Sequence, residues 1–324
     1  MGRRQFIYPN GRVSALEPQL LGRRMWQMLL SADDREEALR LLGDTWYSAF
    51  MEHRSLDHTF ERAMTATEEE LLELSEDPRL VRGIMHRRDV RNARYLWKAH
   101  LLGGDPERVS VEEPGLVDLQ LLRQALSSEE ARESLPGVFS EAAEELLAMD
   151  GPSAVGVDAV MDRLAARVEL EELPELGDSF SVFVRTHIET QNFLTAGRAR
   201  LQEVPVEQLE QMLVPGGYHS IEEISRAYRK NGLPEALATT TGLEELAGVL
   251  EDCLESESLQ AYERQTDAVI LEMLDRTSYA AFGPESLAAF VVKRELEIRH
   301  LRILIAGKTA GMDRRRLLRR LPRG

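Results

Sequence analysis

The chain has 324 residues, of which 43% are hydrophobic and 30% are charged, and its formal net charge is −16. This composition excludes a disordered chain and argues against free nucleic acid as a partner. The single cysteine, Cys253, excludes an intrachain disulfide, and the lack of both an 18-residue apolar run and a signal-peptide core at the start predicts a cytoplasmic location.

Helical periodicity dominates the chain from its first third to its end, and no convincing strand ladder is present. Leu, Ala, Glu and Arg are abundant, and Gly or Pro separates the periodic segments. The pair Thr67 and Glu70 fits a capping box, and Ser31 with Asp34 resembles one, so both mark predicted helix starts. We therefore predict an all-α fold, with helices in segments 31–44, 67–77, 116–135, 140–149 and 243–274.

Three segments of the chain, 87–100, 186–199 and 294–307, align with one another without gaps. Residues three apart share a helix face, so a polar pair at this spacing is expected to act together. Two interpretations stay open: the pairs form hydrogen bonds inside each unit, or they line a socket for a partner. The aligned acids are Asp89, Glu189 and Glu297, and the aligned amide or imidazole residues are Asn92, Asn192 and His300.

Two further kinds of residue recur at similar distances from the aligned acids. An acid lies 32, 31 and 30 residues before the aligned acids, at Asp57, Asp158 and Asp267, and a glycine expected just before a helix recurs at Gly11, Gly115 and Gly217. These landmarks predict three helical units, residues 1–104, 105–205 and 206–324, although the units are permuted if the N-terminal segment packs on a neighbour. A pseudo-threefold funnel is expected, because a closed ring of units needs no end caps.

Two stretches, 87–98 and 313–324, are basic in an acidic chain. Each is either a solvated surface or a docking patch for an acidic partner. Positions in and around the three aligned helices give the candidate partner-binding residues Arg87, Arg91, Arg94, Lys98, Arg198, Arg299, Arg302 and Lys308.

The stretch ILIAGKTAG, residues 303–311, contains Gly-Lys-Thr, the second half of a P-loop. A P-loop would also require glycine at position 302, where the chain has Arg302. The stretch follows a helical pattern, so Gly307 and Gly311 are expected at a helix end, without a nucleotide. His-Glu-x-x-His and Gly-x-Ser-x-Gly are absent from the sequence, and we expect no catalytic residue, cofactor or metal.

Several of these segments resemble the C-subunit family of the A-type/V-type ATPases (ATP synthases), whose homologue in the eukaryotic vacuolar enzyme is the d subunit. The resemblance is carried by ELEIRHLRILIAGKTAGM (295–312), LLGDTWYSAF (41–50) and the Asp-x-x-Asn helix, and it extends over essentially the whole chain. The middle unit resembles the family less closely, and His300 stands where the family has an Asn-like residue.

The resemblance implies a non-catalytic rotor subunit of the central stalk, held at the cytoplasmic side of the membrane. Such a protein is a socket that links the membrane rotor ring of c-type subunits to the central shaft of subunits D and F. It transmits torque and so couples ion transport with ATP synthesis or hydrolysis on other subunits. The alternative is a generic α-helical repeat scaffold or peptide-binding protein unrelated to ion pumping.

Overall fold

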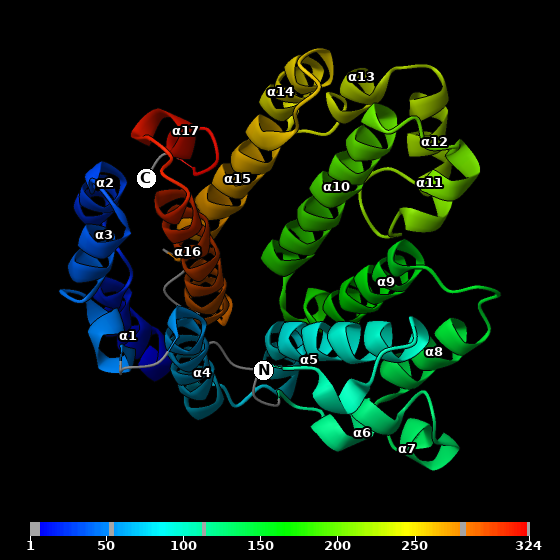
Figure 1. Ribbon diagram of the computed structural model, residues 1–324, viewed down its shortest axis with the longest axis horizontal. Coiled ribbons are helices and arrows are strands. Elements are labelled where there is room, and N and C mark those ends of the chain that lie inside the picture. Colours follow the sequence, from blue (N-terminus) through cyan, green and yellow to red (C-terminus); the bar gives the residue numbers. More distant parts are fainter. Residues whose placement is uncertain (1–6, 52–54, 112–114, 279–282, 323–324) are drawn as a thin grey trace. The chain divides into compact units, whose positions relative to one another are not determined.

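The structure, a computed structural model, describes residues 7–51, 55–111, 115–278 and 283–322. These residues form helices and contain no strand, so the all-α prediction is confirmed (Figure 1). None of the helices within these ranges is both long enough and apolar enough to cross a membrane. The chain divides into two compact units, one made of both chain ends (1–77 and 248–324, unit 1) and one made of the middle (78–247, unit 2).

Unit 1 is built around its longest helix, α16 (Glu285–Thr309). The core between α16 and the N-terminal helices contains Leu29, Tyr47, Phe60, Leu301 and Leu304, all fully buried. This unit therefore depends on packing between residues from opposite ends of the sequence. Its other helices are α1 (Ile7–Leu16), the 3₁₀ helix η2 (Glu17–Gln19), α2 (Arg23–Ser31), α3 (Arg35–Leu42), the 3₁₀ helix η3 (Trp46–Phe50), α4 (Leu56–Leu74), α15 (Gln260–Ser278) and α17 (Arg314–Leu318).

Unit 2 is built around two long helices that pack side by side, α5 (Pro78–Leu101) and α9 (Ala154–Glu172). Trp97 anchors this core, since it is buried and its indole N–H donates to the carbonyl of Leu122 at 2.8 Å. The remaining α-helices are α6 (Leu119–Gln124), α7 (Glu129–Glu133), α8 (Gly137–Leu147), α10 (Asp178–Leu201), α11 (Val206–Met212), α12 (Ile221–Arg229) and α13 (Leu233–Leu237), followed by α14 (Glu244–Glu255), which contains the boundary between the units. Two short 3₁₀ helices, η4 (Pro106–Arg108) and η5 (Pro174–Leu176), complete unit 2 within the described residues.

Helices are present in the predicted segments, but several of them begin or end at other residues than predicted. Segment 116–135 forms two short helices, α6 and α7, and segment 243–274 is divided between α14 and α15. Thr67 lies inside α4, where its hydroxyl donates to the carbonyl of Ala63 at 2.9 Å, so the helix start predicted there is wrong. Asp34, not Ser31, caps α3, and its carboxylate accepts the N–H of Glu37. The three-unit division and the funnel stay predictions.

Candidate functional site

The three aligned acids lie on the three long helices α5, α10 and α16 and are buried. The exposed fractions of Asp89, Glu189 and Glu297 are 1%, 0% and 6%. Each carboxylate accepts a main-chain N–H from a segment just before a short helix. The repeated acid is therefore a device that ties a long helix to a neighbouring turn within its own unit.

In the first copy, Asp89 accepts the N–H groups of Leu116 at 2.9 Å and of Val117 at 3.2 Å. Burial raises the pKa of Asp89, and these hydrogen bonds oppose that rise. The preceding Gly115 is needed for the close approach, because a Cβ atom there would lie 2.5 Å from Oδ1 of Asp89.

In the second copy, Glu189 accepts the N–H groups of Tyr218 at 2.9 Å and of His219 at 3.1 Å. A Cβ atom on the preceding Gly217 would lie 2.6 Å from Oε2 of Glu189. One turn further along α10, the Asn192 amide donates to the carbonyl of Val214 at 2.7 Å and accepts the N–H of the same residue at 2.9 Å. The middle copy thus fixes two points of the α11–α12 connection to α10.

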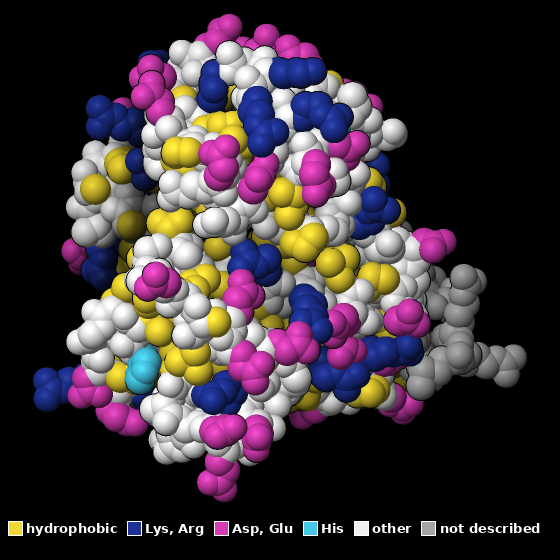
Figure 2. Space-filling model, turned by 90° about the vertical axis from the view of Figure 1, so that its right-hand side faces the viewer, with side chains coloured by type: hydrophobic (Ala, Val, Ile, Leu, Met, Phe, Trp, Pro, Cys, Tyr) yellow, Lys and Arg dark blue, Asp and Glu magenta, His cyan; other side chains and the backbone are white. Residues whose placement is uncertain are grey.

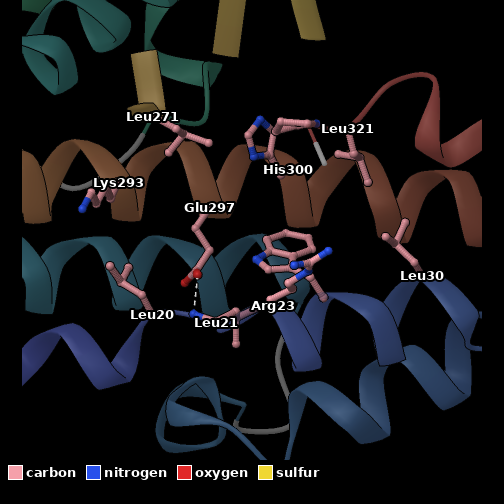
Figure 3. A pocket seen from close by; sticks show the side chains of 11 residues that line it. Leu20, Leu21, Arg23, Leu30, Leu271, Lys293, Glu297, His300 and Leu321 are labelled. Atoms are coloured by element: carbon pink, nitrogen blue, oxygen red, sulfur yellow. Dashed lines mark hydrogen bonds between the residues drawn. The ribbon is translucent and has the colours of Figure 1, made fainter. Parts of the chain in front are cut away.

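In the third copy, Glu297 accepts the N–H of Leu21 at 2.6 Å (Figure 3). It also accepts the hydroxyl of Tyr47 at 2.8 Å. Burial raises the pKa of Glu297, although the charge of Arg294 opposes the rise. The sequence pattern placed Gly11 before a helix here, but Gly11 lies inside α1, so that prediction is wrong. The segment before α2 supplies the N–H instead.

Arg294 is a buried member of this cluster that the sequence pattern did not indicate. Its guanidinium is 0% exposed and donates from Nη1 to Glu297 at 2.6 Å and to the carbonyl of Gln19 at 3.2 Å. It also lies 4.1 Å from the ring centroid of Trp46. Trp46 belongs to the segment LLGDTWYSAF, so this segment contacts the buried guanidinium of Arg294.

The basic residues of α5 have acidic neighbours inside unit 2. Lys98 donates to Asp158 at 2.6 Å, Arg94 pairs with Asp158 at 3.6 Å, and Arg87 pairs with Glu169 at 2.8 Å. Arg91 is half-buried on the same helix. Asp158, one of the three recurring upstream acids, thus neutralises part of the predicted partner-binding face. On the face of the molecule drawn in Figure 2, basic and acidic side chains are likewise interspersed.

The other two upstream acids act in the same way within unit 1. Asp267 accepts a hydrogen bond from Nε2 of His300 at 2.8 Å and pairs with Arg299. Asp57 lies 3.7 Å from Arg302. Among the remaining candidates, Arg198 is exposed on α10 and Asn92 is buried on α5.

The Asp267 cluster predicts a dependence of stability on pH. Burial opposes the charged form, but the hydrogen bond from His300 and the charge of Arg299 together lower the pKa of Asp267 below 3.8. A carboxyl group whose pKa is lower in the folded state than in the unfolded state stabilises the fold at pH values above its unfolded pKa. This contribution is lost as the pH falls through the pKa of the folded state. We expect the difference in unfolding free energy between wild type and Asp267→Asn to be full above about pH 5 and to shrink towards pH 3.

Urea unfolding of both proteins across this pH range measures that difference. Asp252→Asn, at an exposed position, serves as the control and should give a small, flat difference. A difference for Asp267→Asn that stays constant down to pH 3 would contradict the assigned role.

The Gly-Lys-Thr triplet lies in the last turn of α16, as predicted. The N–H groups of Gly311 and Met312 bond to the carbonyls of Lys308 at 3.0 Å and Gly307 at 2.8 Å, and φ of Gly311 is 67°. This is a Schellman helix end. Lys308 is 7% exposed, and its ammonium donates to the carbonyls of Leu30, at 3.0 Å, and Ala32. Lys308 thus caps the C-terminal end of α2, and we withdraw it from the partner-binding set.

We predict that a larger side chain at position 307 disturbs packing and does not alter the binding of a ligand. A Cβ atom there would lie 2.5 Å from a methyl carbon of Leu317, so Gly307→Ala is expected to lower the unfolding free energy by about 1–3 kcal/mol through overpacking. The matched control is Gly248→Ala in α14, where nothing lies within 4 Å and the better helix propensity should stabilise by up to about 1 kcal/mol. Isothermal titration with ATP should detect no binding to either protein; affinity that Gly307→Ala abolishes would reverse this interpretation.

Comparison with known proteins places the chain in a family. The profile of the ATP synthase (C/AC39) subunit family matches residues 9–320. The chain is 24% identical to the C subunit of the A-type ATP synthase of Methanocaldococcus jannaschii, over 94% of this chain and 82% of that protein. It is 27% identical to the same subunit of Thermococcus gammatolerans, over 92% and 85%.

A third relative is the C subunit of the V-type sodium ATPase of Enterococcus hirae, which is 23% identical over 92% of each chain. The family profile and these relatives cover both compact units. The chain therefore belongs to the ATP synthase (C/AC39) subunit family.

Proposed function

We propose that this protein is a non-catalytic rotor subunit of the central stalk of an A-type or V-type ATPase. It is held at the cytoplasmic side of the membrane by a ring of c-type subunits and receives the shaft made of subunits D and F. The family match over residues 9–320 and relatives named as C subunits of an A-type ATP synthase and of a V-type sodium ATPase support this role.

The observation that carries the proposal is the repeated use of charged side chains to fix the main chain. Asp89, Glu189 and Glu297 each bind main-chain N–H groups inside a packed unit. A part that transmits torque must resist deformation, and close-packed interiors joined by satisfied buried hydrogen bonds are stiff.

The same contacts support a non-catalytic role. A general acid or base needs a carboxylate that can reach a substrate. The three acids that recur in the sequence instead accept hydrogen bonds from the chain itself. Their shared spacing within the chain is explained by internal structure, and ATP hydrolysis or synthesis belongs to other subunits of the assembly.

The test compares the ATPase assembly with and without this chain in sealed vesicles. Without it, the catalytic head should still hydrolyse ATP, but hydrolysis should no longer drive ion uptake. Adding the purified chain should restore uptake, and the chain should then co-purify with the membrane ring and the shaft. Ion uptake that is equally fast without the chain would contradict the proposal.

A further inference from the structure

The C-terminal segment 313–322 is basic, with five arginines and a single acid, Asp313, which caps α17. Its arginines are exposed, and none of them forms an ion pair within the residues that the structure describes. In the stretch 87–98, by contrast, Arg87 and Lys98 pair with acids of α9. The exposed arginines are Arg314, Arg315, Arg316, Arg319 and Arg320.

This segment is held on a firm base. Leu317 and Leu321 are buried in the core of unit 1, and the guanidinium of Arg264 donates to the carbonyl of Leu318 at 3.2 Å. The Asp313 carboxylate accepts the N–H of Arg316 at 2.8 Å and begins α17. The arginines therefore project from a fixed turn of chain, which lowers the entropy lost when they bind a partner.

A small, mostly apolar pocket adjoins this segment. Leu321 and Pro322 line it together with Trp26 and Leu30 of α2, and Arg23 is a further exposed cation at its wall (Figure 3). Its volume is about 220 Å³, below the ~300–1,000 Å³ of pockets that enclose a small molecule. The space is suited to an apolar side chain of a larger partner.

We propose that segment 313–322 and the adjoining pocket form a docking surface for an acidic segment of another subunit, which places one apolar side chain in the pocket. The source of this partner rests on the proposed function. Arginine forks bind carboxylates in bidentate fashion. Since the chain as a whole is acidic, with a net charge of −16, this cationic patch orients an acidic partner.

A lipid surface fits these observations less well. A helix that lies in a membrane interface directs apolar side chains into the bilayer. In this segment, Leu317 and Leu321 are committed to the core of unit 1, so only the charges remain to bind lipid. The apolar pocket beside the arginines, too small for an acyl chain of ordinary length, points to an anchored protein segment.

Zero-length cross-linking in the intact ATPase assembly tests this proposal. A carbodiimide joins carboxylates to lysine amines but not to guanidinium groups, and the chain has only four lysines, Lys98, Lys230, Lys293 and Lys308. In the variant Arg315→Lys/Arg319→Lys the charge is kept, and we expect a new cross-link to an Asp or Glu of another subunit. Arg40→Lys is the control, because Arg40 lies 3.9 Å from Asp44 and should give a cross-link within the chain.

Charge reversal provides the second measurement. Arg315→Glu/Arg319→Glu should weaken binding of the chain to the remaining assembly about tenfold or more, and added salt should weaken wild-type binding more than variant binding. An assembly that forms normally while the Lys variant gives no intersubunit cross-link, with the Arg40→Lys control working, would overturn the docking surface alone.

Binding to phosphatidylserine vesicles that charge reversal abolishes, without any intersubunit cross-link, would assign the patch to lipid and also overturn it. Failure of the wild-type chain to join the assembly at all would instead reject the proposed function, and this inference with it.

Discussion

Replacing Arg294 by Met is expected to lower the free energy of unfolding by about 3–5 kcal/mol. The guanidinium is fully buried and paired with Glu297 at 2.6 Å. Removing it leaves the Glu297 carboxylate in a low-dielectric interior with only Leu21 N–H and the Tyr47 hydroxyl as donors. It also removes the stacking on Trp46. The loss arises mainly from the charge left behind, because a buried ion pair adds little net stability when intact.

That origin can be separated from simple loss of packing by a second variant. Arg294→Met/Glu297→Gln removes both charges, so it should recover a large share of the stability lost in the single variant. Urea unfolding measures both, and Arg276→Met, which breaks the exposed pair with Glu272, should change the unfolding free energy by less than about 0.5 kcal/mol. A single variant that loses less than about 1 kcal/mol would show that the cluster tolerates an unpaired acid.

Glu189→Ala is expected to cost roughly 3–5 kcal/mol, because it leaves several buried donors without an acceptor. The groups affected are the N–H groups of Tyr218 and His219 and the hydroxyl of Thr240, which donates to Glu189 at 3.1 Å. The small cavity that remains adds to the cost. Glu189→Gln should cost less, since the amide oxygen still accepts one of these hydrogen bonds.

Hydrogen exchange identifies where this loss acts. In Glu189→Ala, the amides of Tyr218 and His219 should exchange much faster than in wild type, while amides in α5 and α9 should change little. Glu222→Ala, at an exposed position at the start of α12, is the control and should leave the exchange of Tyr218 unchanged. Unaltered protection at Tyr218 and His219 would mean that Glu189 does not hold this turn.

The sequence predicts the position of the polar clusters better than their partners. The common phase of Asp89, Glu189 and Glu297 was visible in the aligned segments, and all three are buried on long helices. The sequence indicated the turns that bind two of these acids, because the recurring glycines Gly115 and Gly217 directly precede those turns. The third partner, Leu21, lies 276 residues before Glu297, and no local pattern marks a contact over such a separation.

The sequence likewise does not show which charged residues form ion pairs and which are exposed. Arg87 and Arg314 look alike in the sequence, yet Arg87 pairs with Glu169, 82 residues away, and Arg314 is exposed. Arg294 was missed because a cation within a helical pattern is ordinarily solvated, and its burial depends on aromatic residues from the other end of the chain. Helix ends such as the break in 116–135 were missed because periodicity continues across a turn.

The composition of unit 1 from both chain ends has a consequence for biosynthesis. Residues 1–77 leave the ribosome before unit 2, but their packing partners in α16 follow only after the whole of unit 2. At ~5–20 residues per second, the intervening stretch takes on the order of ten seconds or more to synthesise. The apolar faces of α2, α3 and α4 remain uncovered meanwhile, so the nascent N-terminal segment is where chaperones should bind and where aggregation should begin.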